Sequence, residues 1–98
     1  MADLLARPWC LALIELGRFD EATAAGKKAQ RQNPSFASAY YCLASAFAHL
    51  GRDAEAHEAA ARVLEIDPSF TISGLIARRG LRNAKLAIKG LRKAVLPE

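Results

Sequence analysis

The sequence has little cysteine, proline and aromatic residue, and it contains no long apolar run. Two cysteines and four prolines occur among 98 residues, and aromatic residues make up 7%. No apolar stretch reaches the roughly 18 residues that a membrane-spanning helix needs. β-branched residues are scarce and alanine is abundant, which favours helices over strands. These deficits argue against a membrane span and against a β fold.

The two cysteines, Cys10 and Cys42, lie far apart in the sequence and outside any CxxC motif. A zinc site needs about four ligands, and His49 and His57 are not placed to complete one. We expect both thiols to be small buried apolar groups and not a disulfide, because the cytosol is reducing. Residues 1–7 lack the basic and then apolar layout of a secretory signal, so we expect a soluble cytoplasmic protein.

The sequence also lacks a catalytic constellation. The acidic pair Asp20 and Glu21 and the pair Glu55 and Glu58 fall in first turns of helices or on an exposed face, where carboxylates interact favourably with the helix dipole. Nothing brings a serine, a histidine and an aspartate together, and no glycine-rich phosphate loop occurs. We therefore predict that the chain is not an enzyme and needs no cofactor and no metal.

The sequence does contain an internal repeat, in which the motif of residues 16–36 recurs in residues 50–70. Leu-Gly-Arg, Glu-Ala and Asn/Asp-Pro-Ser-Phe recur in the same order, each 34 residues after its first occurrence. A period of this length is typical of stacked helix–turn–helix units. Such arrays bind partners on a curved surface and rarely carry chemistry.

Helical periodicity and breaker residues predict six helices. Gly17 and Gly51 end helices as C-terminal glycines, and Pro34 and Pro68 stop the helices that precede them. The predicted helices cover about residues 3–16, 19–32, 36–50, 53–66, 72–79 and 84–95. We expect the last two helices to cover the second unit as a cap with a polar exterior.

The repeated phrase resembles the tetratricopeptide repeat. With Pro34 and Pro68 as the proline before each new unit, the close-crossing small positions of that family fall on Cys10, Ala22, Ala44 and Ala56. Gly26 and Ala60 stand where the family prefers an aromatic residue, and we expect Phe36 and Phe70 to fill the space. The resemblance implies an all-α right-handed solenoid: repeat 1 at about 3–36, repeat 2 at about 37–70 and capping helices at about 71–96.

A second resemblance covers residues 47–98 and is most specific in the closing Gly-Leu-Arg-Lys-Ala-Val-Leu-Pro-Glu. This half looks like the C-terminal tail of bacterial multidomain regulators, in which tetratricopeptide repeats follow a class III adenylate/guanylate cyclase domain or a winged-helix domain. If so, the chain is a detached tail of such a protein, without the cyclase catalytic domain.

In the tetratricopeptide repeat family, the first helices of successive units line a concave groove. The resemblance therefore implies a groove for a peptide or helix, with Tyr41 as its best anchor because Tyr40 and Tyr41 cannot both face the core. A solvated His49 remains the simpler reading of that histidine. The groove residues so identified are Arg7, Leu11, Ile14, Ser38, Tyr41, Cys42, Ser45 and His49. An occluded groove, with residues 38–49 packed against the chain's own tail, would argue against peptide binding.

Charge is unevenly distributed along the chain. Residues 78–98 hold seven lysines and arginines and one glutamate, whereas the other residues hold seven basic and nine acidic side chains. The basic side chains of this segment are Arg78, Arg79, Arg82, Lys85, Lys89, Arg92 and Lys93. They form a solvated helix face, a contact to an acidic partner or, third, a nucleic-acid surface, although no aromatic residues interleave with them.

We therefore predict a non-catalytic protein–protein interaction module, with a protein or peptide as partner and self-association as a second use. The alternative is a nucleic-acid-binding adaptor that works through the basic C-terminal helix. We expect no membrane partner.

Overall fold

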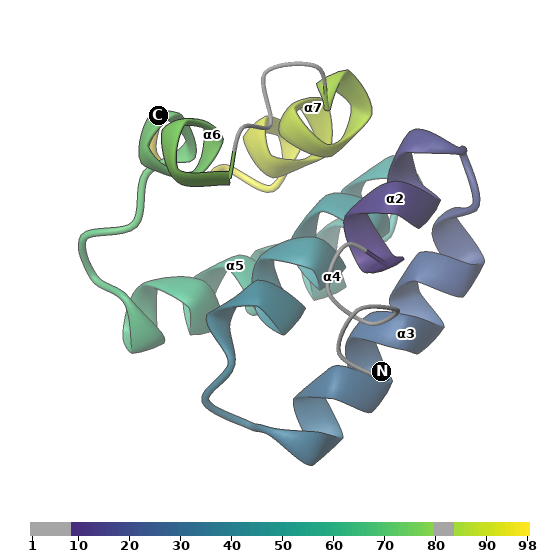
Figure 1. The fold of residues 1–98 in the computed structure, drawn as a ribbon, viewed down its shortest axis with the longest axis horizontal. Helices are drawn as coiled ribbons and strands as arrows, with labels where there is room; N and C mark the ends of the chain where they lie inside the picture. Colours follow the sequence, from purple (N-terminus) through teal and green to yellow (C-terminus); the bar gives the residue numbers. More distant parts are fainter. Residues whose placement is uncertain (1–8, 80–83) are drawn as a thin grey trace.

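The computed structural model describes residues 9–79 and 84–98, which fold into helices joined by short turns (Figure 1). The helices are α2 (Trp9–Glu15), α3 (Phe19–Gln32), α4 (Ala37–His49), α5 (Asp53–Ile66), α6 (Ile72–Arg79) and α7 (Lys85–Lys93). No strand occurs in these two stretches, and none of their helices is long and apolar enough to cross a membrane. The all-α prediction is confirmed.

The helix boundaries agree closely with those predicted from the sequence. The first helix is the exception, because its predicted residues 3–8 lie outside the part that the structure describes. Gly17 and Gly51 follow α2 and α4, and both have a φ of 77°. This left-handed conformation costs glycine little, which is why the chain can turn sharply at the end of each first helix.

Each repeat is a hairpin of two helices, α2 with α3 and α4 with α5, and the hairpins meet where α3 packs on α4. Small side chains line the crossings. Ala22 and Ala44 are 0% exposed and Ala56 is 1% exposed. With no bulk beyond Cβ, these residues let the helix axes approach closely, and the exclusion of water from the contact stabilises the pair. The predicted crossing positions are confirmed.

At Gly26 and Ala60, where the family prefers an aromatic residue, different side chains lie nearby. At Gly26, a Cβ atom would lie 2.8 Å from Leu43 Cδ2, so Leu43 itself occupies the space. Phe70 joins the main core, which also contains Ala60. Phe36 does not fill either gap, because it is 41% exposed. The prediction for Phe36 is therefore wrong, and the prediction that Phe70 fills one of the gaps stays a prediction.

The two cysteines are buried, as predicted, but they are not separate thiols. A disulfide joins Cys10 in α2 to Cys42 in α4, with 6.1 Å between the Cα atoms. The expectation that they stay unpaired is wrong because α2 packs on α4 in the stack, which brings positions about one period apart side by side. The bond lies in a small core cluster with Ile14, Ala22, Ala46 and Ala87.

The last two helices do not extend the stack beyond α5. No Cα atom of α6 or α7 lies within 8 Å of one in α5, whereas α7 packs on α4 and α2 (Figure 1). The carbonyl oxygens of Pro97 and Glu98 accept hydrogen bonds of 2.8 Å from the backbone N–H groups of Ile72 and Ser73. The C-terminal segment thus supplies acceptors to the first turn of α6, whose N–H groups have no partner within the helix. Helix α7 therefore covers α4 of the second repeat, as expected of a cap, but it also reaches α2 of the first repeat, and neither of the last two helices packs on α5.

Val95, two residues after the end of α7, lies in the left-handed region, with a φ of 67°, and is 73% exposed. A β-branched residue is strained there, and little buried apolar area offsets the strain. We expect Val95→Gly to raise the free energy of unfolding by about 1 kcal/mol. Urea unfolding of the wild type, Val95→Gly and Val95→Ala would measure it. A stability of the glycine variant equal to or below that of the alanine variant would contradict the strain.

Candidate functional site

The surface that α2 and α4 share is the face on which the family resemblance places the groove. We call it the inner groove and define it by Ile14, Glu15, Cys42, Ser45 and His49. Helix α7 fills it: Ala87 packs among Cys10, Ile14 and Cys42, and Leu91 and Ala94 belong to the main core with Tyr41 and Ala48. The occupant of this groove is therefore the chain's own C-terminal helix.

Side chains of the inner groove hold the first turn of α7 by its backbone. The Glu15 carboxylate accepts hydrogen bonds from the N–H groups of Leu86, at 3.4 Å, and Ala87, at 2.7 Å. These N–H groups have no partner within α7, and a carboxylate at a helix N-terminus also interacts favourably with the dipole. The contact therefore fixes where along the groove the helix begins.

Two further groups of the inner groove donate to the same turn. Ser45 Oγ donates to the carbonyl oxygen of Ala87 at 2.8 Å, and His49 Nε2 donates to the carbonyl oxygen of Leu86. The His49 ring stacks on Phe19, with ring centroids 4.6 Å apart. Ser45 is 0% exposed, so its hydroxyl would be costly to bury without this acceptor. The polar groups of the groove are matched to a helix backbone.

Gly90 sets how closely α7 approaches α4. A Cβ atom at this position would lie 2.2 Å from Ser45 Oγ, 2.6 Å from the Ser45 carbonyl oxygen and 2.9 Å from Ser45 Cα. Backbone atoms cannot move aside as a flexible side chain does, so no larger residue fits at the present separation. The groove in this form requires a glycine in the helix that it holds.

The predicted groove residues are brought together, but they do not form an open surface. Ile14, Tyr41, Cys42 and Ser45 are buried, Leu11, Ser38 and His49 are partly buried, and Arg7 lies outside the described residues. The reason is the apolar side of α7, which needs a surface to cover it and finds it here. The structure thus corrects the open groove to an occluded one, since residues 41–49 pack against the tail, and this arrangement argues against peptide binding while α7 stays in place. A role of these residues in binding a partner remains a prediction.

Tyr40 and Tyr41 are both buried and both belong to the main core, so the expectation that they cannot both face the core is wrong. Tyr41 stacks on Phe70 at 5.8 Å between ring centroids, and its hydroxyl accepts a hydrogen bond from Ser38 Oγ at 3.1 Å. Tyr41, Ser38 and Phe70 line a hollow of about 370 Å³ between the start of α4, residues 67–70 and α6. This hollow is the part of the predicted groove that α7 leaves uncovered.

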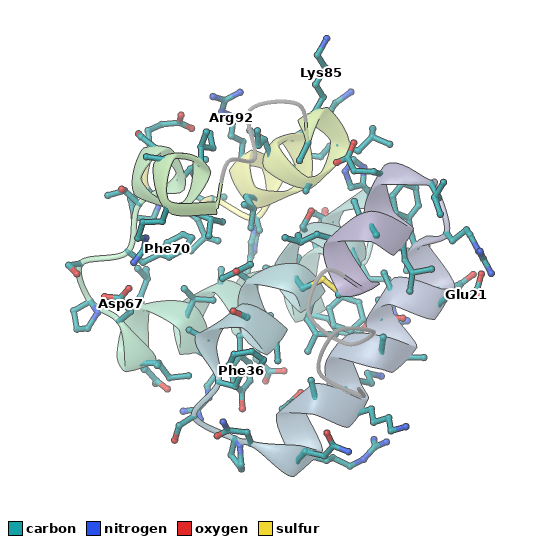
Figure 2. All side chains as sticks on the ribbon, in the orientation of Figure 1. Glu21, Phe36, Asp67, Phe70, Lys85 and Arg92 are labelled. Carbon is teal, nitrogen blue, oxygen red and sulfur yellow. A yellow bond between two sulfur atoms is a disulfide. The ribbon has the colours of Figure 1, made fainter. Side chains whose placement is uncertain are left out.

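The basic side chains of the C-terminal segment lie on the surface. Figure 2 shows Lys85 and Arg92 pointing away from the helices beneath them. Lys89 and Lys93 are also exposed, Arg92 pairs with Glu98 at 3.0 Å, and Arg78 Nε donates to the Gly74 carbonyl oxygen at 3.3 Å. The Arg79 side chain and Arg82 lie outside the described part. The predicted polar exterior of the last helix is confirmed for Lys85, Lys89, Arg92 and Lys93.

Sequence reasoning missed Gly90 and Glu15 as the residues that seat α7. A signal was present for Gly90, because an isolated glycine inside a helical pattern usually has a packing reason. The family resemblance also implies a groove-facing position for Glu15, but nothing in the sequence marked this residue as the acceptor for the first turn of α7.

Among known families, the model described as "Tetratricopeptide repeat" matches residues 9–69, which is more than half of the chain. No curated protein and no solved structure matches the chain. The match covers both hairpins and ends before α6. No comparison supports the second resemblance, to the tails of cyclase or winged-helix regulators.

Proposed function

Because the chain belongs to the tetratricopeptide repeat family, we propose that it is a non-catalytic protein-interaction module whose inner groove binds a helical segment. Repeats of this family generally mediate protein–protein interactions. The observation that carries the proposal is the way α7 is held: Glu15, Ser45 and His49 bond to backbone atoms of the helix. A groove that binds a helix through its backbone atoms accepts a helix that has glycine at the crossing with Ser45.

In the present arrangement α7 is an internal competitor for that groove. A segment tethered to its own site acts at an effective concentration in the millimolar range. A partner helix of equal intrinsic affinity therefore binds only when α7 has left. We propose that release of α7 precedes partner binding, so that the module is closed until a stronger helix or another signal opens it.

A peptide supplied in trans tests this function. The probe is a fluorescently labelled synthetic peptide of residues 84–98, and the receptor is the full chain with Gly90→Leu, in which the internal helix no longer fits. We expect this variant to bind the peptide at least about 10-fold more tightly than the wild type does, because the internal competitor is weakened. Fluorescence anisotropy measures the affinity, and circular dichroism verifies that the variant keeps its helices.

Two matched controls belong to that measurement. Lys89→Leu adds the same side chain at the neighbouring exposed position of α7 and should leave the groove closed. A peptide that itself carries leucine in place of Gly90 should not bind either receptor. Equal affinity of the Gly90→Leu and Lys89→Leu proteins for the native peptide, with both folded, would overturn the proposal.

A second candidate is nucleic-acid binding through the exposed side chains of Arg78, Lys85, Lys89 and Lys93. Affinity for duplex DNA that falls steeply with salt would support this alternative, since phosphate contacts release counterions. The absence of detectable binding at low salt would eliminate it.

A regulatory role as the tail of a longer bacterial protein rests on the resemblance of residues 47–98 alone. An upstream cyclase or winged-helix domain in the same reading frame would support it.

A further inference from the structure

A second groove lies on the opposite side of α4 from α7. No Cα atom of α3 lies within 8 Å of one in α5, although both helices pack on α4, and the space between them is a hollow of about 540 Å³. We call it the outer groove. Its floor is formed by Tyr40, Leu43 and Phe47, which are buried in the main core and present one side to the hollow. A volume of this size accommodates several side chains of a ligand.

The α3 wall of the outer groove is basic and its charge is not neutralised. Lys27 and Arg31, one turn apart on α3, line the hollow, and neither forms an ion pair with an acidic side chain of the described residues. Lys27 Nζ lies 5.6 Å from the centre of the Phe47 ring. A cation over an aromatic face at the edge of an apolar floor offers a carboxylate a partner beside a hydrophobic surface.

The α5 wall is different, because most of its charge is already paired. Glu55 pairs with Arg52 at 2.5 Å, and Arg62 pairs with Glu65 and lies over the Tyr40 ring at 5.3 Å. The hydrogen bond with the Tyr40 hydroxyl, and then that with Glu65, raises the pKa of Arg62 above its ordinary value, so this side chain stays cationic. Glu58 is left as the acid of this wall without an ion pair in the described part of the chain. The unpaired charge of the groove is therefore two cations against one anion.

We propose that the outer groove binds an acidic peptide segment of a partner protein, which inserts apolar side chains against Leu43 and Phe47 and faces Lys27 and Arg31 with its carboxylates. The apolar floor supplies most of the affinity, as buried anchors do at other interfaces. The basic wall selects the sign of the flanking charge. The acids of α5 oppose a polyphosphate backbone, which would have to lie along both walls, so the charge distribution favours a peptide over a nucleic acid.

The proposal is independent of the inner groove, because the two surfaces use opposite faces of α4. Tyr40, Leu43 and Phe47 follow the 3–4 spacing of one helix face, and Cys42, Ser45 and His49 follow that of the other. A ligand of the outer groove therefore leaves α7 in place, and the failure of one proposal does not entail the failure of the other.

Two synthetic helical peptides provide the test. One has leucine at every third or fourth position and glutamate elsewhere, and the other has lysine in place of every glutamate. We expect the wild-type chain to bind the glutamate peptide about 10-fold more tightly than the lysine peptide, given two exposed charge pairs. NMR shifts of the Leu43 methyl groups and the Phe47 ring locate the binding, and titration gives the affinity.

Charge reversal on the α3 wall makes the test sharper. The double variant Lys27→Glu/Arg31→Glu should reverse the preference and bind the lysine peptide more tightly. The control Lys28→Glu also replaces a basic residue of α3 by glutamate, but at an exposed position outside the groove. Its affinities for both peptides should stay within about twofold of those of the wild type. An unchanged preference in the double variant would overturn the proposal, as would no binding of either peptide at millimolar concentration or shifts that appear at Ser45 and Gly90 instead.

Discussion

Replacing Gly90 by leucine is expected to lower the free energy of unfolding by about 3 kcal/mol or more, because α7 cannot remain in the inner groove. Even the first carbon of the new side chain would lie 2.6 Å from the Ser45 carbonyl oxygen. Leucine is a better helix former than glycine by about 1 kcal/mol, so helix propensity alone would make the variant more stable. The expected loss of stability therefore comes from the packing of α7 on α4. Separation of the helices would also expose Ala87 and Leu91, which are buried in the wild type.

Urea unfolding of Gly90→Leu and Lys89→Leu, followed by circular dichroism, measures this loss. Lys89 is exposed, so the same leucine there should change the stability by no more than about 0.5 kcal/mol. If the two variants unfold at the same urea concentration, α7 does not pack closely on α4 and the occluded groove is wrong.

Reduction of the disulfide is the second change expected to have a large effect. Cys10 and Cys42 close a loop across the first hairpin, with a sequence separation of 32. In the chain-entropy model a loop of this size contributes about 3–4 kcal/mol, because the bond restricts the unfolded chain. We expect the reduced protein to unfold at a markedly lower urea concentration than the oxidised protein.

Unfolding with and without a phosphine reductant, together with a thiol titration, provides the measurement. The double variant Cys10→Ala/Cys42→Ala should be as stable as the reduced wild type and insensitive to reductant. Two titratable thiols in denatured wild type purified without reductant, together with a transition that reductant does not shift, would contradict the bond.

The sequence carried enough information to predict the helices and their hairpin pairing. Gly17, Gly51, Pro34 and Pro68 mark ends through backbone conformation, and that signal is local. The small residues at the crossings were predictable because the 34-residue period fixes which positions are equivalent. Ala22 and Ala56 are accordingly both buried.

The location of α7 could not be predicted in the same way. The pattern of Ala87, Leu91 and Ala94 shows which side of the helix is buried, but it does not specify the surface that covers it. A cap at the end of the stack and a return to α2 and α4 bury the same side. The choice depends on long-range contacts, such as Glu15 with the first turn of α7, which leave no periodic trace in the sequence.

The prediction that the two cysteines stay unpaired failed for a related reason. Separation along the chain says little about distance in a repeat array, because equivalent positions of neighbouring units become neighbours in space. Cys10 and Cys42 lie two residues short of one full period apart, on helices that stack. An argument from the cellular compartment could not replace that geometry.

The most direct test of whether α7 occupies the inner groove is to measure, in solution, whether protons of α7 lie close to protons of α4. A nuclear Overhauser spectrum of the wild-type chain should contain a cross-peak between the α protons of Gly90 and the protons of Ser45, and Leu91 amide exchange should be slow. Absence of that cross-peak, with residues 85–93 exchanging as fast as an unfolded peptide, would show that the groove is open and α7 is undocked.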